Sequence, residues 1–186
     1  MKSFRSSVQG KTWRKGNYLI STDHTAIPVA DLINAFASDE FYWANEISTD
    51  AMKETLENSL CFGLYDTAVS APTESATPDS MFIGIARCVT DFVTFVYVTD
   101  VWVDSGYQGQ GLGSWLIKCI QETIEPMPYL RRSMLFTGDW ERSVPFYEKL
   151  MDMKVMNEPQ RGQGLALLER KGRGHPSYGH DGSGYN

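Results

Sequence analysis

A glycine-rich turn runs directly from a long apolar strand into a helix, and it constrains the fold more than any other segment. The turn reads Gln108-Gly109-Gln110-Gly111-Leu112-Gly113-Ser114. Its three glycines let the backbone approach a ligand without a Cβ in the way. The N–H groups at the start of the helix then point at one small volume, which suits a pyrophosphate. The alternative is a plain strand-to-helix connection, which the glycines alone do not exclude.

Two other phosphate-binding motifs fit this turn less well. A dinucleotide-binding fingerprint would need its first glycine where Gln108 stands. A nucleotide P-loop would need a lysine after the glycines, and none follows Gly113.

Hydrophobic patterns predict strands and helices on both sides of the turn. Runs rich in Val, Ile, Phe and Tyr predict strands, and apolar residues at helical spacing predict helices. Asp91 and Phe92 are expected to join an antiparallel pair whose second strand is the long central one. The expected strands are 17–21, 60–65, 81–90, 93–103, 133–136, 154–156 and 165–168. A first helix is expected from Ser21 or Thr22 to residue 37, with Pro28 in its first turn. Further helices are expected over 50–59, 112–125 and 140–150.

The length and composition predict one domain. The 186 residues are 42% hydrophobic and 22% charged, which is enough to bury a core without disulfide or metal staples. We expect residues 1–170 to form this domain and the Gly- and Ser-rich residues 171–186 to be a disordered tail. Cys61, Cys88 and Cys119 lie in apolar stretches and are not at zinc-ligand spacing, so we expect buried thiols and no metal site.

The charge and the lack of long apolar runs exclude some partners. A net charge of −6 argues against binding to nucleic acid, which needs clustered Lys and Arg. No apolar run approaches the roughly 18 residues of a membrane span, so no membrane partner is expected. These features favour a cytosolic location, with the nucleus as the alternative, and they leave monomer and homodimer open.

Two segments carry a resemblance to a known family. Val101-Trp102-Val103-Asp104-Ser105-Gly106-Tyr107, leading into Gln108-x-x-Gly111-x-Gly113, resembles the acetyl-CoA signature of the GNAT superfamily of N-acetyltransferases. Phe146-Tyr147-Glu148-Lys149-Leu150-Met151-Asp152-Met153 is similar to the family's later FYEKLGF segment. The resemblance covers 81–155 well and the first eighty residues only by element order. Two positions depart from the family: Asp139, Trp140 and Glu141 stand where an Asn often contacts pantetheine, and Met151 or Asp152 replaces a glycine.

The resemblance implies an α+β fold, in three layers. A mixed, mostly antiparallel central sheet, flanked by about four helices, would be splayed between strands 4 and 5 of the family. Here those strands are 93–103 and 133–136. It also implies acetyl-CoA as co-substrate, filling the splay with its pantetheine. The implied cofactor-binding residues are Val101, Trp102, Val103, Gln108, Gly109, Gln110, Gly111, Leu112, Gly113 and Ser114.

Two residues are catalytic candidates. Tyr147 aligns with the tyrosine that protonates the leaving thiolate in the family, and the alternative is a core tyrosine on an amphipathic helix. Asp100 lies on the long strand, where some polyamine-acetylating relatives have the Asp of a Glu-Asp pair, with Thr99 replacing the Glu. An unpaired buried carboxylate would be costly, so we expect Asp100 to bind an ammonium group or to take its proton through water. The alternative is a structural role as acceptor for backbone N–H groups near the strand splay.

The acceptor is expected to bind beside the first helix. Phe41, Tyr42 and Trp43 follow that helix, which overhangs the acceptor pocket in the family, and Thr99 is a weaker polar candidate. A satellite hydrophobic cluster would explain the three aromatic residues equally well. The leading function is acetylation of a small-molecule amine. The alternatives are acetylation of a protein lysine or N-terminus, and a non-catalytic acyl-CoA-binding module.

Overall fold

The protein folds around one six-stranded sheet with the strand order β1-β2-β3-β4-β5-β6. The computed structural model describes residues 3–38, 44, 47–68 and 80–156. All neighbouring strands are antiparallel except β5 and β6, which are parallel. The strands are β1 (Thr12–Lys15), β2 (Tyr18–Ser21), β3 (Leu60–Asp66), β4 (Met81–Thr90), β5 (Phe95–Val103) and β6 (Arg132–Met134).

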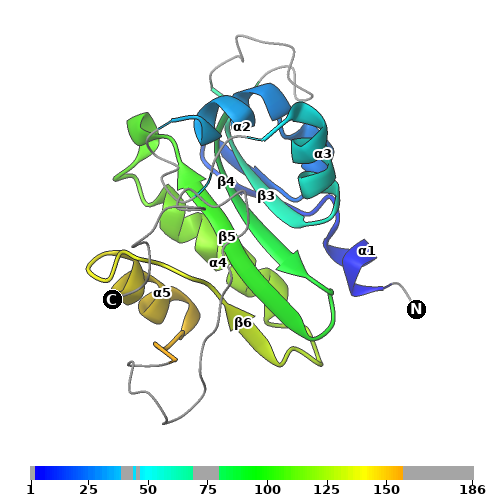
Figure 1. Cartoon of the computed structure of the whole chain (residues 1–186). Coiled ribbons are helices and arrows are strands. Elements are labelled where there is room, and N and C mark those ends of the chain that lie inside the picture. The colour runs from blue at the N-terminus through cyan, green and yellow to red at the C-terminus, as the bar shows by residue number, and fades with distance from the viewer. Residues whose placement is uncertain (1–2, 39–43, 45–46, 69–79, 157–186) are drawn as a thin grey trace, which may run out of the picture.

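Helices cover both faces of the sheet and complete three layers (Figure 1). On one face, α2 (Val29–Phe36) and α3 (Thr49–Glu57) bury Leu32, Met52 and Leu56 against Cys61 and Ile85 of the sheet. On the other face, α4 (Leu112–Ile124) and α5 (Ser143–Met151) pack in a larger cluster with β3, β4 and β5. The short helix α1 (Phe4–Val8) joins this second cluster through Val8. The predicted layered α+β fold is confirmed.

The sheet splits between β5 and β6. Only Phe95, Val96 and Tyr97 of β5 pair with β6, through Arg132, Ser133 and Met134. The rest of β5, from Val98 to Val103, has no partner in β6. This is the splay that the sequence predicted between 93–103 and 133–136, and it leaves one edge of β5 without a neighbour from β6.

The N-terminal segment contains two elements that the sequence did not predict. Ser3 caps α1 by accepting a hydrogen bond from the Ser6 N–H, and β1 pairs with β2 through a tight hairpin at Gly16. Both elements were missed because α1 has one buried residue, Val8, and because Arg14 and Lys15 in β1 are exposed. Pairing with β2, rather than burial, defines β1.

Several predicted boundaries were wrong for local reasons. The helix expected from Ser21 or Thr22 is split at Pro28 into a 3-10 turn at His24–Ala26 and α2, because proline has no N–H to continue the helix. The strand expected from Val93 begins at Phe95, because the Asp91 Oδ1 accepts hydrogen bonds from the N–H groups of residues 93–95. The helix expected from Trp140 begins at Ser143, after a turn in which Asp139 Oδ1 accepts from Arg142 N–H.

The C-terminal expectations are only partly covered by the described residues. Residues 154–156 are not in a strand, and their predicted partner at 165–168 lies outside the described residues, as do the expected domain limit at 170 and the tail. Asp152 ends α5 at a φ of 50°, so an aspartate adopts the left-handed conformation that a glycine usually provides. The cytosolic location and the choice between monomer and homodimer remain predictions.

The described residues also bear on thiols, metals and membranes. Cys61, Cys88 and Cys119 are buried and unpaired, and burial raises the pKa of Cys61 to about 12. The part of the chain that the structure describes has no cluster of three His, Cys, Asp or Glu side chains suited to a metal ion. Within the same part, no helix is both long enough and apolar enough to cross a lipid bilayer.

Tyr65 offers a test of the packing beneath α2 and α3. Its hydroxyl is fully buried without a hydrogen-bond partner among the described residues, and its ring lies over Gly63, where a Cβ would be 2.8 Å from Tyr65 Cζ. Because an unsatisfied buried hydroxyl costs about 1 kcal/mol or more, we expect Tyr65→Phe to raise the free energy of unfolding by about that amount.

Denaturant unfolding would measure this gain. The matched control is Tyr18→Phe, which removes the 2.8 Å hydrogen bond from Tyr18 Oη to Gln110 Oε1 and should give no gain. A loss of stability in Tyr65→Phe would mean that the hydroxyl does have a partner, such as a buried water.

Candidate active site

The glycine turn leads directly into α4, as its sequence predicted. Gly109 and Gly111 adopt left-handed conformations, with φ of 78° and 75°, which non-glycine residues rarely adopt. Gly111 is the residue immediately before α4, so this conformation turns the chain into the helix. Gly113 lies within the first turn of α4, and a Cβ placed on it would meet no atom within 4 Å. Gly109 and Gly111 are therefore required by the backbone conformation of the turn. Gly113 is not, and the space beside its Cα at the first turn of α4 is open.

The turn presents a row of unsatisfied backbone donors. The Trp115 N–H is the first in α4 to find a helical partner, donating to the Gly111 carbonyl at 3.1 Å. The N–H groups of residues 109–114 have no acceptor among the described residues. Helix starts leave such donors open, and the helix dipole adds a partial positive charge there. An anionic group with several oxygens would satisfy these donors, so the turn fits a pyrophosphate.

Hydrogen bonds from β5 and the following 3-10 segment, Ser105–Tyr107, hold the turn in place. Gln108 Nε2 donates to the Val103 carbonyl at 2.9 Å and ties the turn to the end of β5. Asp104 Oδ1 accepts from the Gly106 N–H at 2.9 Å, and the Asp104 N–H donates to the Ile83 carbonyl of β4 at 2.9 Å. The donors are therefore positioned before any ligand binds.

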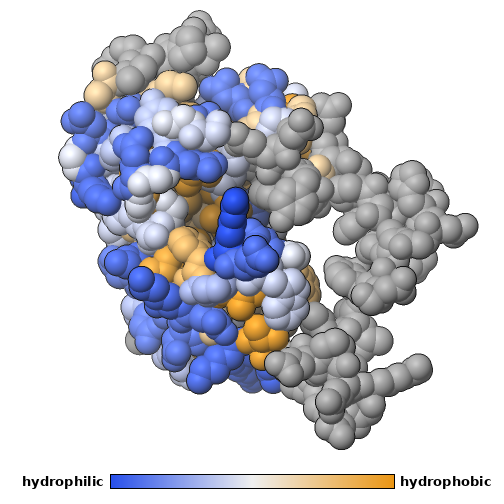
Figure 2. Space-filling model, turned by 90° about the vertical axis from the view of Figure 1, so that its left-hand side faces the viewer, coloured by the Kyte–Doolittle hydropathy of each residue, from blue (hydrophilic) through white to orange (hydrophobic). Residues whose placement is uncertain are grey.

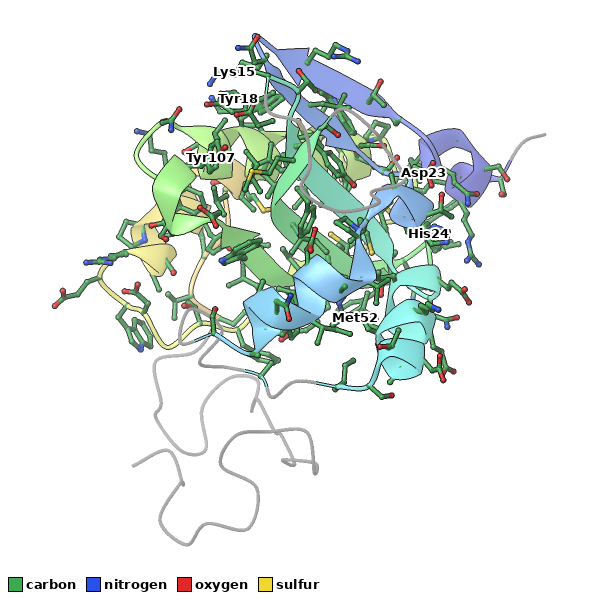
Figure 3. All side chains as sticks on the ribbon, turned by 90° about the horizontal axis from the view of Figure 1, so that it is seen from above. Lys15, Tyr18, Asp23, His24, Met52 and Tyr107 are labelled. Atoms are coloured by element: carbon green, nitrogen blue, oxygen red, sulfur yellow. The ribbon has the colours of Figure 1, made fainter. Side chains whose placement is uncertain are left out.

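The β1–β2 hairpin brings a cation to the turn. Figure 3 shows Lys15 and Tyr18 together at the end of this hairpin, with Tyr107 nearby. A Cβ on Gly111 would lie 4.0 Å from Lys15 Nζ, and Tyr18 Oη donates to Gln110 Oε1 at 2.8 Å. Lys15 has no carboxylate partner among the described residues. Its ammonium group is thus available to an anion bound at the turn.

Sequence reasoning missed Lys15, because β1 was not predicted. The signal that could have found it is the Gly16-Asn17 pair, which is typical of a two-residue hairpin turn. That pair alone would still not have shown which part of the chain the hairpin contacts.

A bulge in β5 determines where the next candidate residues point. Arg87 of β4 pairs with Thr99 and Ile85 pairs with Trp102, so β5 has one extra residue between these pairs. Asp100 has a φ of 50°, and Thr99 Oγ1 lies 3.2 Å from Asp100 Oδ1, so two consecutive side chains share a face.

Beyond the bulge, the alternation of β5 is reversed. Val96 and Val98, and then Val101 and Val103, pack on the side of α4 and α5. Trp102 packs instead with the cluster under α2 and α3. The three predicted cofactor contacts Val101, Trp102 and Val103 therefore point to opposite faces, and only the backbone of this stretch follows the splayed edge.

Asp100 forms a buried ion pair with Arg87. Arg87 Nε lies 2.6 Å from Asp100 Oδ2, and the two side chains are 19% and 8% exposed. Arg87 Nη1 also donates to Ser59 Oγ at 3.0 Å. Arg87 was not among the sequence-predicted site residues, although it is the single charged residue in the apolar strand β4. A lone charge in such a strand needs a buried partner, which was the available signal.

The ion pair lies at a cavity of about 170 Å³ on the α2 and α3 side of the sheet. The predicted acceptor residues Phe41, Tyr42 and Trp43 lie outside the described residues, but Ala44 and Ile47 next to them line this cavity. Thr99 lies beside Asp100, as expected from their adjacent positions. The lining residues are Leu32, Phe36, Ala44, Ile47, Met52, Thr55, Leu56, Ile85, Arg87 and Asp100.

Tyr147 approaches from the other layer. It is half-buried on α5, packs edge-on against Phe146 at 5.1 Å and contacts the cluster formed with α4. Burial raises the pKa of Tyr147 to about 12, with a smaller contribution from Cys88. Its hydroxyl has no hydrogen-bond partner among the described residues. The structure does not bring Tyr147 and Asp100 into contact, because Tyr147 packs on the α4 and α5 face of the sheet and Asp100 lines the cavity on the α2 and α3 face.

The surface on this side is suited to an elongated amphipathic ligand. Where α5 and the 3-10 segment after β5 lie, apolar side chains separate two polar regions (Figure 2). A ligand with phosphates at the glycine turn and a less polar chain along β5 would match this distribution.

Comparison with known proteins places these features in one family. The family model described as Acetyltransferase (GNAT) family matches residues 30–153. A Gibberella zeae protein named as a candidate acetyltransferase is 35% identical over 173 residues, which cover 89% of this chain and 96% of that protein.

Two solved structures are similar in fold. A candidate GNAT acetyltransferase from Xanthomonas campestris has a TM-score of 0.61 and 24% identity, with 85% of this chain and 95% of that one covered. A ribosomal-protein-S5-alanine acetyltransferase from Vibrio fischeri has a TM-score of 0.56 and 16% identity, with 75% and 81% covered.

A substitution at Gly113 can test phosphate binding without disturbing the fold. We expect Gly113→Asp to weaken acetyl-CoA binding at least tenfold, about 1.4 kcal/mol, because a carboxylate above the helix start repels phosphate. The fold should be unaffected, because the space is open and an acidic residue in the first turn favours a helix. Calorimetry with acetyl-CoA and thermal unfolding measure the two effects. The control is Gly113→Ala, and equal affinity in both variants would contradict a phosphate site.

Lys15 provides a second test on the same site. We expect Lys15→Gln to weaken acetyl-CoA binding up to about fivefold at low salt, which corresponds to the ~1 kcal/mol of an exposed ion pair. The difference should shrink as salt screens the charge. The control is Arg14→Gln, one residue earlier in β1, where the side chain points to the opposite face of the sheet. Titrations of both variants with acetyl-CoA at two salt concentrations measure the effect. Equal losses of affinity in Lys15→Gln and Arg14→Gln would exclude a specific role for Lys15.

Proposed function

This chain belongs to the GNAT family of acetyltransferases, and we propose that it transfers the acetyl group of acetyl-CoA to a small-molecule amine. The observation that carries this proposal is the row of open backbone donors at residues 109–114, next to the part of β5 that has no neighbour in β6. The first feature suits the phosphates of acetyl-CoA. The second suits the extended pantetheine chain, because β5 and β6 separate over this stretch and an extended chain can lie between them.

The residues fit acetyl-CoA in charge and in shape. The donors of residues 109–114 and the Lys15 ammonium group would hold the phosphates, while Gly113 leaves room for them. The edge of β5 from Val98 onward would direct the chain of the ligand toward the bulge at Asp100. When bound, acetyl-CoA supplies an activated acyl group, so the protein needs no covalent nucleophile.

The protein's own groups would manage protons. An amine is nucleophilic only when it has lost its proton, and the Asp100 carboxylate can accept that proton directly or through a water molecule. Tyr147 can hold a proton at its Oη for the departing thiolate. Because burial raises the pKa of Tyr147 to about 12, its phenol stays protonated at neutral pH and can act only as a donor.

The cavity is the observation that favours a small molecule over a protein acceptor. Its volume of about 170 Å³ is below the roughly 300–1,000 Å³ of sites for drug-sized ligands. A lysine side chain of a protein could enter only if the groove around the cavity also accepted the neighbouring peptide. The non-catalytic module remains the third possibility, since it would need neither Asp100 nor Tyr147.

Tyr147→Phe tests the mechanism. We expect the rate of acetyl transfer to fall by about a hundred- to ten-thousandfold, the usual contribution of general acid catalysis, while acetyl-CoA affinity is retained because the ring still packs. The loss should be constant between about pH 6 and 10, because the raised pKa keeps the wild-type phenol protonated throughout.

Single-turnover transfer at saturating acetyl-CoA measures this step without interference from product release. The control is Tyr129→Phe, which alters a 70% exposed tyrosine in the connection between α4 and β6. A Tyr147→Phe variant as fast as wild type would remove Tyr147 from the mechanism. If no amine released CoA even from wild-type protein that binds acetyl-CoA, the non-catalytic module would be the better description.

A further inference from the structure

We propose that the acceptor is a free amino acid with an apolar side chain, with its carboxylate bound by Arg87 and its amine by Asp100. This inference rests on the proposed acetyl transfer and identifies the class of the amine. It follows from three observations on the cavity: its apolar lining, its one buried ion pair, and the unused donors of Arg87.

The lining of the cavity is almost entirely apolar. Among the described residues around it, Thr55, Arg87 and Asp100 are the polar ones. Burial of apolar surface is favourable and burial of an unpaired charge is not, so this lining stabilises an aliphatic or aromatic group and not a second charged one. The apolar lining is formed by Leu32, Phe36, Ala44, Ile47, Met52, Leu56 and Ile85.

The two charges at the cavity are opposite and adjacent. Arg87 Nε and Asp100 Oδ2 are 2.6 Å apart, and the pair is mostly shielded from solvent. Drawing one partner of a buried pair away leaves the other uncompensated, which is strongly unfavourable. A simple amine cation would compete with Arg87 for Asp100, and a simple anion would compete with Asp100 for Arg87. A zwitterion supplies one opposite charge to each partner and keeps the site neutral.

Arg87 retains donors for such a ligand. Its Nε is used by Asp100 and its Nη1 by Ser59, while Nη2 has no partner among the described residues. A guanidinium group has five N–H donors in a fixed plane and binds carboxylates well. A carboxylate has about four acceptor positions, and at Asp100 the contacts with Arg87 Nε and Thr99 Oγ1 occupy two of them. In an α-amino acid the amine and the carboxylate are also adjacent, as Arg87 and Asp100 are.

The reaction of such a substrate balances without another reagent. The ammonium group gives one proton to Asp100 or to water there, and the amine nitrogen then forms a bond to the thioester carbonyl carbon and loses a second proton to solvent. The carbon–sulfur bond breaks, and the CoA sulfur takes a proton from Tyr147, which is then reprotonated by solvent. The products are an N-acetyl amino acid and CoA, with one proton released overall.

Three acceptors that differ in one group test the inference. L-leucine has both charges, leucinamide lacks the negative charge, and 3-methylbutylamine lacks the carboxylate altogether. We expect kcat/KM for leucine to exceed that of both analogues at least tenfold, and to exceed that of aspartate similarly, because aspartate would put a second charge against the apolar wall. Release of CoA measures all four.

Variants of Arg87 then test whether its positive charge causes the preference for leucine over 3-methylbutylamine. Arg87→Gln should raise the KM for leucine at least tenfold and should lower the ratio of kcat/KM for leucine to kcat/KM for 3-methylbutylamine at least tenfold, and Arg87→Lys should restore part of that ratio. The matched control is Arg131→Gln, which removes an exposed arginine outside the cavity. If Arg87→Gln does not fold, the comparison of Arg87→Lys with wild type on the same substrates replaces it.

Binding without turnover gives an independent readout. Leucine should bind to wild-type protein in complex with CoA by calorimetry, and it should bind at least tenfold more weakly to the folded Arg87 variant. Leucine that neither binds nor reacts would overturn the inference. Equal or better use of 3-methylbutylamine, a polyamine or a lysine peptide would overturn it as well, while leaving acetyl transfer intact. A protein that binds no acetyl-CoA and acetylates none of these acceptors would instead contradict the proposed function itself. In that case calorimetry of leucine with the protein alone would still show whether the cavity binds an amino acid.

Discussion

The bulge in β5 is the constraint on which the rest of the site depends. In a regular strand, residues 99 and 100 would point to opposite faces. The extra residue places Thr99 and Asp100 on the same face and moves the following valines back into the core beside α4. One local irregularity therefore allows a charged side chain in a central strand without interrupting the hydrophobic packing on either side.

The bulge also explains the position of Arg87. A carboxylate turned toward the interior must be paired, and Arg87 on the neighbouring strand β4 is within hydrogen-bonding distance. The pair in turn places two charges at one end of a cavity that is otherwise apolar. Removal of either partner would leave the other charge buried, so the two side chains form a single unit in both structure and chemistry.

The phosphate side of the site is built on a different principle. Its positive character comes mostly from backbone N–H groups at the start of α4, and among the described residues Lys15 adds a side-chain cation close to Gly111. Backbone donors cost no side-chain entropy to position, and the hydrogen bonds of Gln108 and Asp104 hold them in place. A protein with a net charge of −6 can bind a polyanion in this way, because the favourable interactions are local.

The sequence by itself determined the features that depend on neighbouring residues. The glycine turn, the α4 helix after it, the long central strand and the family were all predictable, because each is encoded in a short run with its own periodicity or motif. Asp100 and Tyr147 could be named as candidates from their positions in such runs. Their roles remain predictions, since the structure places them on different layers.

Only the tertiary structure decided which distant segments meet. The hairpin that brings Lys15 to Gly111 was not visible, because β1 is held by pairing with β2 and has little hydrophobic pattern of its own. The pairing of Arg87 with Asp100, and the reversal of alternation that permits it, depends on the register between β4 and β5. Strand register and bulges are set by long-range packing, which a linear pattern of residues does not contain.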